Sequence, residues 1–456
     1  MRADKRRLLI RLSSVLSLLV FSLALLRLEK PFRPNIILIT IDALRADHLG
    51  CYGYARNTSP NIDKLAKEGV LFTQAIAQSS HTPPSTASIL TSTLPHTHLL
   101  LHWGDTIRPG LATLPAVLKA NGYQTFFICG NGNFSTGLHG FAKSFDLFYD
   151  KYYDSAAISN KIYDIISRYS KKPFFVWVHY MDAHQYAPLE PFDKIFIGDK
   201  LYDFHKKLPI VKDVFDRYGY KGIPESLAAQ KGNVDNPDYY VAQYDGGIRT
   251  IDEQLGLLLK KIDKLHLKRE PLLIITSDHG EMLGEHAYYF HHCWFLYEPI
   301  IKVPLIIKCD KVIPQNKVIN MQISAHLDIM PTILDILKIN NIKTLEGTSL
   351  LPLILHNEKY PFSYVITDEG HGEKCIRTDG WKLIYTNHRY KKGYELYNLK
   401  EDPWESNNLV SFEKKEFGFL KSKLDGYKQA CMQDRKDKPT LDEETKERLK
   451  SLGYTQ

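Results

Sequence analysis

Three residues that can bind a metal ion follow two apolar runs of the sequence. Asp42 comes directly after the run 35–41, and Asp278 and His279 come shortly after the run 272–276. Two carboxylates and an imidazole at neighbouring strand ends suit one divalent cation, which would supply Lewis-acid chemistry. Asp42 taken alone is more simply interpreted as the N-cap of a helix. Taken together, the three residues favour a metal site.

A hydroxyl side chain stands at a predicted helix start. Thr82 lies in the stretch SHTPPST, residues 80–86, ahead of an apolar helix expected over 87–94. The simple interpretation is that Thr82 caps this helix, with proline just inside it. A helix N-terminus also stabilises anions through its N–H groups and dipole, so these groups could cradle a phosphate or sulfate oxygen. A nearby cation would lower the pKa of the hydroxyl and make Thr82 a nucleophile.

Two groups of histidines supply further candidates. The stretch HYMDAH, residues 179–184, follows an apolar run, and HHC, residues 291–293, follows Asp278 at a short distance. A lone histidine is more often structural than catalytic. Because these histidines gather in loops after predicted strand ends, we take His184 and His292 as candidate catalytic residues.

Short apolar runs separated by helix-length segments indicate the elements that position these side chains. The runs cover residues 35–41, 125–129, 174–178, 272–276 and 304–307, and the helical segments cover 62–69, 112–121 and 244–264. Continuous apolar strands alternating with helices predict an α/β fold, in which helices sandwich a mostly parallel sheet. Ligands bind at the carboxyl ends of the strands in such sheets, and the candidate residues lie there.

The composition changes after Leu355. Short strands are expected over residues 363–367, 381–386 and 395–398, with turn residues between them. We therefore divide the chain into a catalytic domain over 34–358 and a small antiparallel C-terminal subdomain over 359–410. The charged segment 411–456 is predicted to form a surface helix and a tail.

Most of the net charge of +7 lies at the N-terminus, because residues 1–33 hold eight Lys or Arg and two acids, a difference of six. The rest of the chain is close to neutral, which does not support binding to nucleic acid. Basic residues 2–7 precede an apolar run over 8–28, a pattern typical of an export segment. We expect residues 1–33 to anchor an extracytoplasmic catalytic domain in a membrane. The alternative is cleavage near residues 22–24 (SLA) and secretion.

Six cysteines are scattered along the chain without a Cys-x-x-Cys pair. This spacing argues against zinc ribbons and thioredoxin-like redox sites. We expect mostly isolated, buried thiols.

Longer motifs place the chain more narrowly. Residues 34–53 read PNIILITIDALRADHLGCYG, and a related stretch continues over 58–70. Further motifs are YDGGIR (244–249), SDHGE (277–281), LYE (296–298), KVPL (302–305), ELYNL (395–399), EDP (401–403) and NNL (407–409). In this order, over about residues 34–410, they resemble the sulfatase family of the alkaline-phosphatase superfamily. The resemblance implies an alkaline-phosphatase-like fold and a metal-dependent hydrolase or transferase.

The resemblance also assigns roles to residues that match family motifs. Asp42, Asp278 and His279 look like metal ligands. Thr82 falls at the nucleophile of the family motif Cys-x-Pro-Ser-Arg, and would also touch the metal.

Three basic residues correspond to substrate-contacting positions of the family. His184 resembles the histidine of Asp-Pro-His. His292 lies where many relatives have the histidine of Phe-Gly-His-Gly or a lysine. Lys302 stands where the family usually has the arginine of Arg-Val-Pro, and is expected to bind substrate.

The departures from the family pattern bear on the mechanism. Ala43 stands where many sulfatases have a second acid, and His279 where many have asparagine. A nitrogen ligand favours Mn²⁺ or Zn²⁺ over Ca²⁺ or Mg²⁺. Thr82 cannot be converted to formylglycine because of its extra methyl group, and Thr86 replaces the arginine of the motif. This arrangement resembles phosphoethanolamine transferases and lipoteichoic acid synthases, which use a threonine nucleophile.

Three functions follow from these residues. The first is a hydrolase or transferase that acts through Thr82 on sulfate or phosphate esters, including phosphodiesters of glycans or lipids. The second is a conventional sulfuric ester hydrolase that uses an unusual route. The third is a catalytically inactive binding protein on the same fold.

Overall fold

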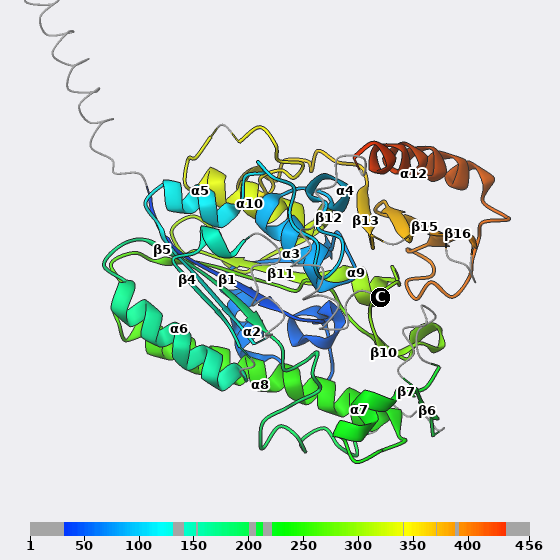
Figure 1. Ribbon diagram of the computed structural model, residues 1–456, viewed down its shortest axis with the longest axis horizontal. Helices are drawn as coiled ribbons and strands as arrows, with labels where there is room; N and C mark the ends of the chain where they lie inside the picture. The colour runs from blue at the N-terminus through cyan, green and yellow to red at the C-terminus, as the bar shows by residue number, and fades with distance from the viewer. Residues whose placement is uncertain are drawn as a thin grey trace, which may run out of the picture.

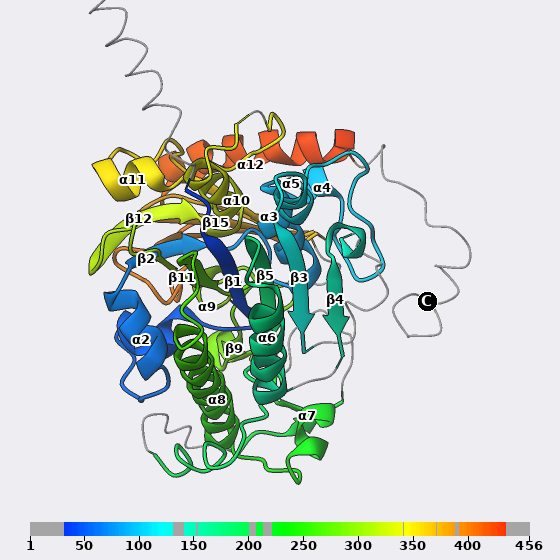
Figure 2. The same ribbon diagram turned by 90° about the vertical axis from the view of Figure 1, so that its left-hand side faces the viewer.

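A mixed eight-stranded sheet forms the centre of the protein. The computed structural model describes residues 32–130, 141–151, 154–199, 207–212, 221–340, 342–370, 372–387 and 392–434. The strands of this sheet are β1 (Asn35–Ile41), β2 (Val70–Ile76), β3 (Gln124–Cys129), β4 (Leu147–Asp150), β5 (Phe174–Tyr180), β8 (Pro271–Thr276), β11 (Lys302–Lys308) and β12 (Lys317–Ser324). Their order is β12-β2-β11-β8-β1-β5-β3-β4, and all of these strands except β8 are labelled in Figure 2.

Strand β11 runs antiparallel to its neighbours β2 and β8, whereas the other neighbouring pairs are parallel. Parallel neighbours need a long crossover connection, usually a helix. Residues 277–301, between β8 and β11, contain only short elements, so the chain returns antiparallel. The predicted mostly parallel sheet is confirmed.

Helices cover both faces of the sheet (Figures 1 and 2). One layer holds α3 (Thr82–Thr91), α5 (Leu114–Ala120), α10 (Ala325–Ile336) and α11 (Leu351–His356), and the other holds α2 (Pro60–Lys67), α6 (Ser155–Tyr169) and α8 (Pro237–Asp263). Alternate residues of a strand point to opposite faces. Accordingly Ile36 and Leu38 of β1 join the first core, whereas Ile37, Ile39 and Ile41 join the second.

A second, smaller sheet follows in the C-terminal part of the chain. It is antiparallel and consists of β13 (Val365–Asp368), β14 (Lys374–Arg377), β15 (Trp381–Asn387) and β16 (Lys392–Asn398). Helix α12 (Lys414–Asp434) lies across this sheet in Figure 1 and buries Leu420, Leu424, Tyr427 and Cys431 against it. The segment predicted as a charged surface helix therefore has an apolar face, and residues 435–456 of the predicted tail lie outside the described residues.

Short elements connect these parts. They are η1 (Ala46–His48), η2 (Gly50–Tyr52), α4 (Pro95–His98), η4 (Ala142–Ser144), β6 (Ile210–Val211), β7 (Ile223–Pro224), α7 (Glu225–Gln230), β9 (Met282–Leu283), η5 (Glu285–Ala287), β10 (Tyr289–His291) and α9 (Glu298–Ile301). All six cysteines are free thiols, and four of them are buried, as expected from their spacing.

The predicted membrane-anchored location is wrong, because the described helices do not support it. Across the described part of the chain, no helix combines the length and the apolar character needed to cross a membrane. The run 8–28, on which the prediction depended, lies outside the described residues.

Candidate metal and active site

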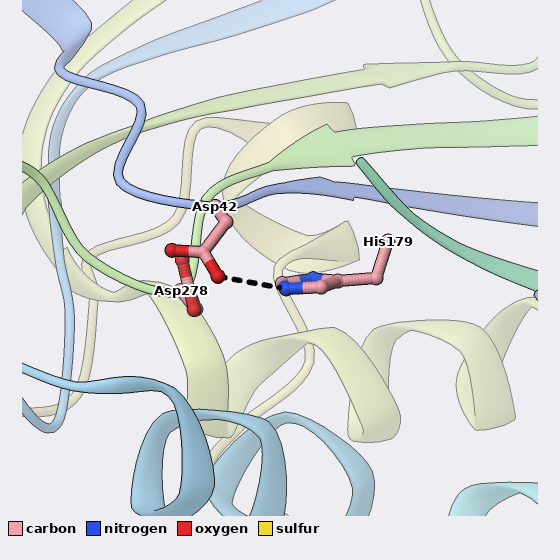
Figure 3. Close-up of side chains that lie close together, drawn as sticks. All are labelled: Asp42, His179 and Asp278. Atoms are coloured by element: carbon pink, nitrogen blue, oxygen red, sulfur yellow. Dashed lines mark hydrogen bonds and ion pairs between the residues drawn. The ribbon is translucent and has the colours of Figure 1, made fainter. Parts of the chain in front are cut away.

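Three neighbouring strands bring potential metal ligands to one edge of the sheet. Asp42 follows β1, Asp278 follows β8, and His179 lies near the end of β5. Strand β1 is parallel to both of its neighbours, and Thr40 pairs with His179 on one side and with Thr276 on the other. One ligand atom each from Asp42, His179 and Asp278 lie within 4.8 Å of one another (Figure 3).

His279 and Thr82 complete the cluster from other directions. His279 Nε2 lies 3.7 Å from Asp42 Oδ1, 3.4 Å from Asp278 Oδ2 and 3.4 Å from Thr82 Oγ1. His279 Nδ1 is 2.9 Å from the carbonyl oxygen of Gly280, which can only accept a hydrogen bond. The ring therefore carries its hydrogen on Nδ1 when neutral, and the lone pair of Nε2 faces the cluster.

The donor set fits a divalent cation. Asp42 Oδ1 and Asp278 Oδ2 are buried and have no hydrogen-bond partner among the described residues. Buried carboxylate oxygens of this kind are costly unless a cation or a donor compensates them. Two atoms bonded to one Zn²⁺ at about 2.0–2.2 Å lie roughly 3 to 3.5 Å apart, close to the separations around His279 Nε2.

The pKa values of the two carboxyl groups are shifted in opposite directions. Burial opposes ionisation of Asp42, but the charge of His184 and the hydrogen bond from His179 outweigh it and hold the pKa of Asp42 below its usual range. Burial and the adjacent negative charge of Asp42 raise the pKa of Asp278. A cation between them would favour the ionised form of both groups.

Thr82 does not cap a helix as predicted. It is the first residue of α3, and the N-cap is His81, which makes no side-chain capping bond. The Thr82 hydroxyl instead lies 3.4 Å from His279 Nε2, the nitrogen that also faces the Asp278 carboxylate. The expected anion cradle is also weaker than predicted, because Pro83 and Pro84 occupy the next two positions and have no N–H to offer.

His184 and His292 lie beside the cluster. The rings of His279 and His292 stack with centroids 4.2 Å apart, and the centroids of His184 and His292 are 5.1 Å apart. His292 Nδ1 is 3.5 Å from Glu281 Oε2. Burial and the neighbouring His279 hold the pKa of His292 well below its usual range, so this imidazole is neutral near pH 7.

Comparisons with known proteins show the family of the chain. The sulfatase family profile matches residues 34–339, and the profile of the N-sulphoglucosamine sulphohydrolase C-terminal region matches residues 284–429. The chain belongs to the sulfatase family. The protein is thus a sulfatase-family hydrolase with the fold that the resemblance implied.

Similar proteins act on several esters. An N-acetylglucosamine-6-O-sulfatase of Bacteroides thetaiotaomicron is 25% identical and spans 91% of this chain and 89% of its own length. A structure solved in complex with its substrate D-glucosamine-2-N,6-O-disulfate has a TM-score of 0.68 at 22% identity, covering 90% of this chain and 100% of its own. A phosphonate monoester hydrolase of Silicibacter pomeroyi has a TM-score of 0.70 at 17% identity, covering 87% of this chain and 95% of its own.

Lys302, predicted to bind substrate, begins strand β11 of this sulfatase fold. It lines a cavity of about 300 Å³ together with Asp47, Glu298, Arg377 and Trp404. Among the described residues that line this cavity, none belongs to the cluster of Asp42, Thr82, Asp278 and His279. The structure therefore brings four of the predicted site residues together and places His184 and His292 beside them, whereas the substrate-binding role of Lys302 stays a prediction.

His179 is the residue of this sulfatase site that the sequence analysis left without a role. It lies inside β5, 3.2 Å from Asp42 Oδ2 through its Nε2 atom. The available indication was position, because His179 ends an apolar run as Asp42 does. The apolar run predicts a strand that ends at residue 178, with His179 in the following loop, whereas strand β5 extends two residues further, to Tyr180.

Proposed function

We propose that this sulfatase-family hydrolase cleaves sulfate or phosphate esters with the Thr82 hydroxyl as a direct nucleophile. The observation that carries this proposal is the position of Thr82 at the start of α3, where its hydroxyl lies 3.4 Å from His279 Nε2, the nitrogen that Asp42 and Asp278 also face. Formylglycine chemistry is not needed, since the side chain of Thr82 already presents an oxygen nucleophile to the cluster.

Asp42, Asp278, His279 and Thr82 would hold the divalent metal ion. When bound, this ion supplies Lewis-acid stabilisation of charge on the ester oxygens and lowers the pKa of an adjacent hydroxyl. The nitrogen of His279 beside two carboxylate oxygens favours Mn²⁺ or Zn²⁺ over Ca²⁺ or Mg²⁺.

Residues of the chain act as nucleophile, proton acceptor, proton donor and substrate-orienting group. Thr82 Oγ1 forms a bond to phosphorus or sulfur while the bond from that atom to the ester oxygen breaks. The hydroxyl proton passes to the Asp278 carboxylate, which faces the same His279 nitrogen as Thr82 and whose pKa is raised by burial and by the charge of Asp42. The leaving oxygen takes a proton from His184, and the neutral His292 orients the substrate. Water then cleaves the covalent threonine ester, or an acceptor hydroxyl takes over the group in a transferase reaction.

We propose a glycan or lipid ester as substrate. Sulfated glucosamine is acted on by the relative and the solved complex described above, which supports a sugar ester. The phosphonate monoester hydrolase shares the fold, and a threonine nucleophile suits phosphoryl transfer. A conventional sulfuric ester hydrolase is the second candidate, and similarity to the N-acetylglucosamine-6-O-sulfatase favours it. An inactive binding protein is the third candidate.

The test is turnover of aryl sulfate, phosphate monoester, phosphodiester and phosphonate monoester by metal-loaded protein. Thr82→Ala should lower the rate by several orders of magnitude, because the covalent route is removed. Thr82→Ser should keep part of the activity, since it keeps the hydroxyl. Intact-mass analysis during turnover should find an adduct on the Thr82 peptide. If Thr82→Ala turned over substrate at the wild-type rate, Thr82 would not be the nucleophile. If the wild-type protein turned over none of these esters, the inactive binding protein would be the remaining candidate.

A further inference from the structure

A buried chain of hydrogen bonds leads from an indole to the metal cluster. Trp177 Nε1 lies 3.0 Å from Thr40 Oγ1, Thr40 Oγ1 lies 2.8 Å from His179 Nδ1, and His179 Nε2 lies 3.2 Å from Asp42 Oδ2. All four side chains are at most 1% exposed. We call these four residues the donor chain, and the direction of each hydrogen bond in it can be derived.

Trp177 fixes the direction at one end. An indole N–H can only donate, so Thr40 Oγ1 accepts from Trp177. The single hydrogen of the Thr40 hydroxyl then has two acceptors in reach, His179 Nδ1 at 2.8 Å and the carbonyl oxygen of Val178 at 3.1 Å. His179 is the nearer acceptor, and donation to it leaves the imidazole hydrogen on Nε2.

Donation from Thr40 to Val178 conflicts with the contact between His179 and Asp42 at the other end of the donor chain. If Thr40 donated to Val178, Nδ1 of a neutral His179 would have to carry the hydrogen. The lone pair of Nε2 would then face the Asp42 carboxylate at 3.2 Å, with no hydrogen between two acceptors. Such an arrangement is unfavourable in a buried site. Donation from Trp177 through Thr40 and His179 to Asp42 satisfies every atom of the donor chain.

We infer that His179 is a positioning residue that orients Asp42 for the metal, rather than a metal ligand. Its hydrogen bond engages Asp42 Oδ2, which leaves Oδ1 as the oxygen without a hydrogen-bond partner, on the side of His279. Figure 3 shows the imidazole approaching the Asp42 carboxylate from the side opposite Asp278. Ala43 supplies no second carboxylate at this strand end, so the orientation of Asp42 decides how the first strand contributes to the site.

This inference rests on the metal site of the proposed function but not on turnover. X-ray absorption of the zinc-loaded protein counts the imidazole ligands. One imidazole is expected in the wild type, one in His179→Gln and none in His279→Gln. Two imidazoles in the wild type, falling to one in His179→Gln, would show that His179 is a ligand and overturn the inference.

Zinc affinity, measured by competition with a chromophoric chelator, tests the positioning role. His179→Ala should bind zinc 10- to 100-fold more weakly, as is usual when a hydrogen-bond partner of a ligand is removed. His179→Gln should recover part of the loss, since its amide can donate to Asp42. Thr40→Val should also weaken binding, because it removes the hydroxyl at nearly constant shape.

Thr276 provides the matched control. Thr276 belongs to the neighbouring strand β8 and pairs with Thr40, and its hydroxyl donates to the nearer carbonyl oxygen, that of Pro304 at 2.8 Å, outside the donor chain. Thr276→Val should therefore leave zinc affinity unchanged, and equal losses in both valine variants would overturn the inference. Wild-type protein that binds no stoichiometric zinc would reject the metal site and the inference together. One-imidazole zinc without turnover would reject only the proposed function.

Discussion

Proton competition at single residues should govern metal binding. The raised pKa of Asp278 means that this carboxyl holds a proton at a pH where an ordinary aspartate is ionised, whereas Asp42 is already ionised. A metal ion must displace that proton, so affinity should rise with pH by about tenfold per unit until Asp278 ionises in the metal-free protein. Chelator competition at increasing pH, starting from the usual aspartate pKa of about 4, measures the slope.

Two variants separate this effect from general instability at low pH. Asp278→Asn should bind metal weakly and lose the dependence on this proton. Asp47→Asn should keep the wild-type slope, because Asp47 pairs with Arg45 outside the cluster. A pH-independent affinity in the wild type would contradict the titration assigned to Asp278.

Residue type and position at a strand end were sufficient to find Asp42, Asp278 and His279, because the register of parallel strands brings such ends together. The same reasoning could not find the donor chain, since hydrogen-bond direction depends on coordinates. The sequence also predicts a capping role for Thr82, whereas its hydroxyl faces His279. The missing amides of Pro83 and Pro84 are evident from the sequence and argue against an anion cradle there.

At the scale of elements, helix α8 positions the loop that carries His184. A Cβ atom at Gly247 of α8 would lie 2.6 Å from the backbone oxygen of Asp182 and 3.0 Å from Cα of Ala183. Gly247→Ala should therefore push this loop away, destabilise the protein by roughly 1–3 kcal/mol and reduce turnover, because His184 moves with it. Denaturant unfolding and steady-state kinetics measure the two effects.

Helix α12 supplies the control for this substitution. Gly426 is also a helical glycine, but a Cβ atom there meets nothing within 4 Å. Gly426→Ala should stabilise the protein by about 0.5–1 kcal/mol through helix propensity alone and leave turnover unchanged. Equal effects at both glycines would show that helix propensity, rather than the contact with the His184 loop, decides the outcome.

The elements themselves were predictable where one face or both faces are continuously apolar. Strand β1 was predicted with its observed bounds, whereas β2 and β12 were missed because polar residues such as Gln74 and Asn320 interrupt them. The antiparallel direction of β11 depends on the short connection from β8, which periodicity does not report. Helix α8 begins seven residues before its predicted start, at Pro237, with Asn236 as a side-chain cap.

At the scale of the whole molecule, buried charges join the two sheets. The Glu298 carboxylate of α9 accepts two hydrogen bonds from Arg377 of β14. Arg377 Nε lies 2.9 Å from Oε1, and Nη2 lies 3.0 Å from Oε2. Lys382 of β15 lies 3.3 Å from Glu298 and 2.8 Å from Glu405, and it is fully buried. An apolar cluster that includes Ile76 of the main sheet and Cys375 of the small sheet surrounds this network. The proposed division into domains near residue 358 therefore crosses a buried interface.

Removing the central acid should uncouple the two sheets. Glu298→Gln keeps the shape of the side chain but leaves Arg377 and Lys382 buried with one carboxylate, so the free energy of unfolding should fall by about 3–5 kcal/mol. Burial opposes ionisation of Glu298, but Arg377 and Lys382 lower its pKa to about 2. A carboxyl group with a lowered pKa stabilises the fold at pH values above its usual pKa. The difference in unfolding free energy between wild type and variant should therefore shrink as pH falls from about 4.5 towards 2.

An exposed ion pair gives the reference for this comparison. Lys64→Gln breaks the pair with Glu68 at 3.6 Å on the surface of α2, and should change the unfolding free energy by less than about 1 kcal/mol. Calorimetry of Glu298→Gln should show the small sheet melting before the main sheet, because the charge network no longer joins them. A single transition with the wild-type midpoint would mean that the apolar cluster alone holds the two sheets together.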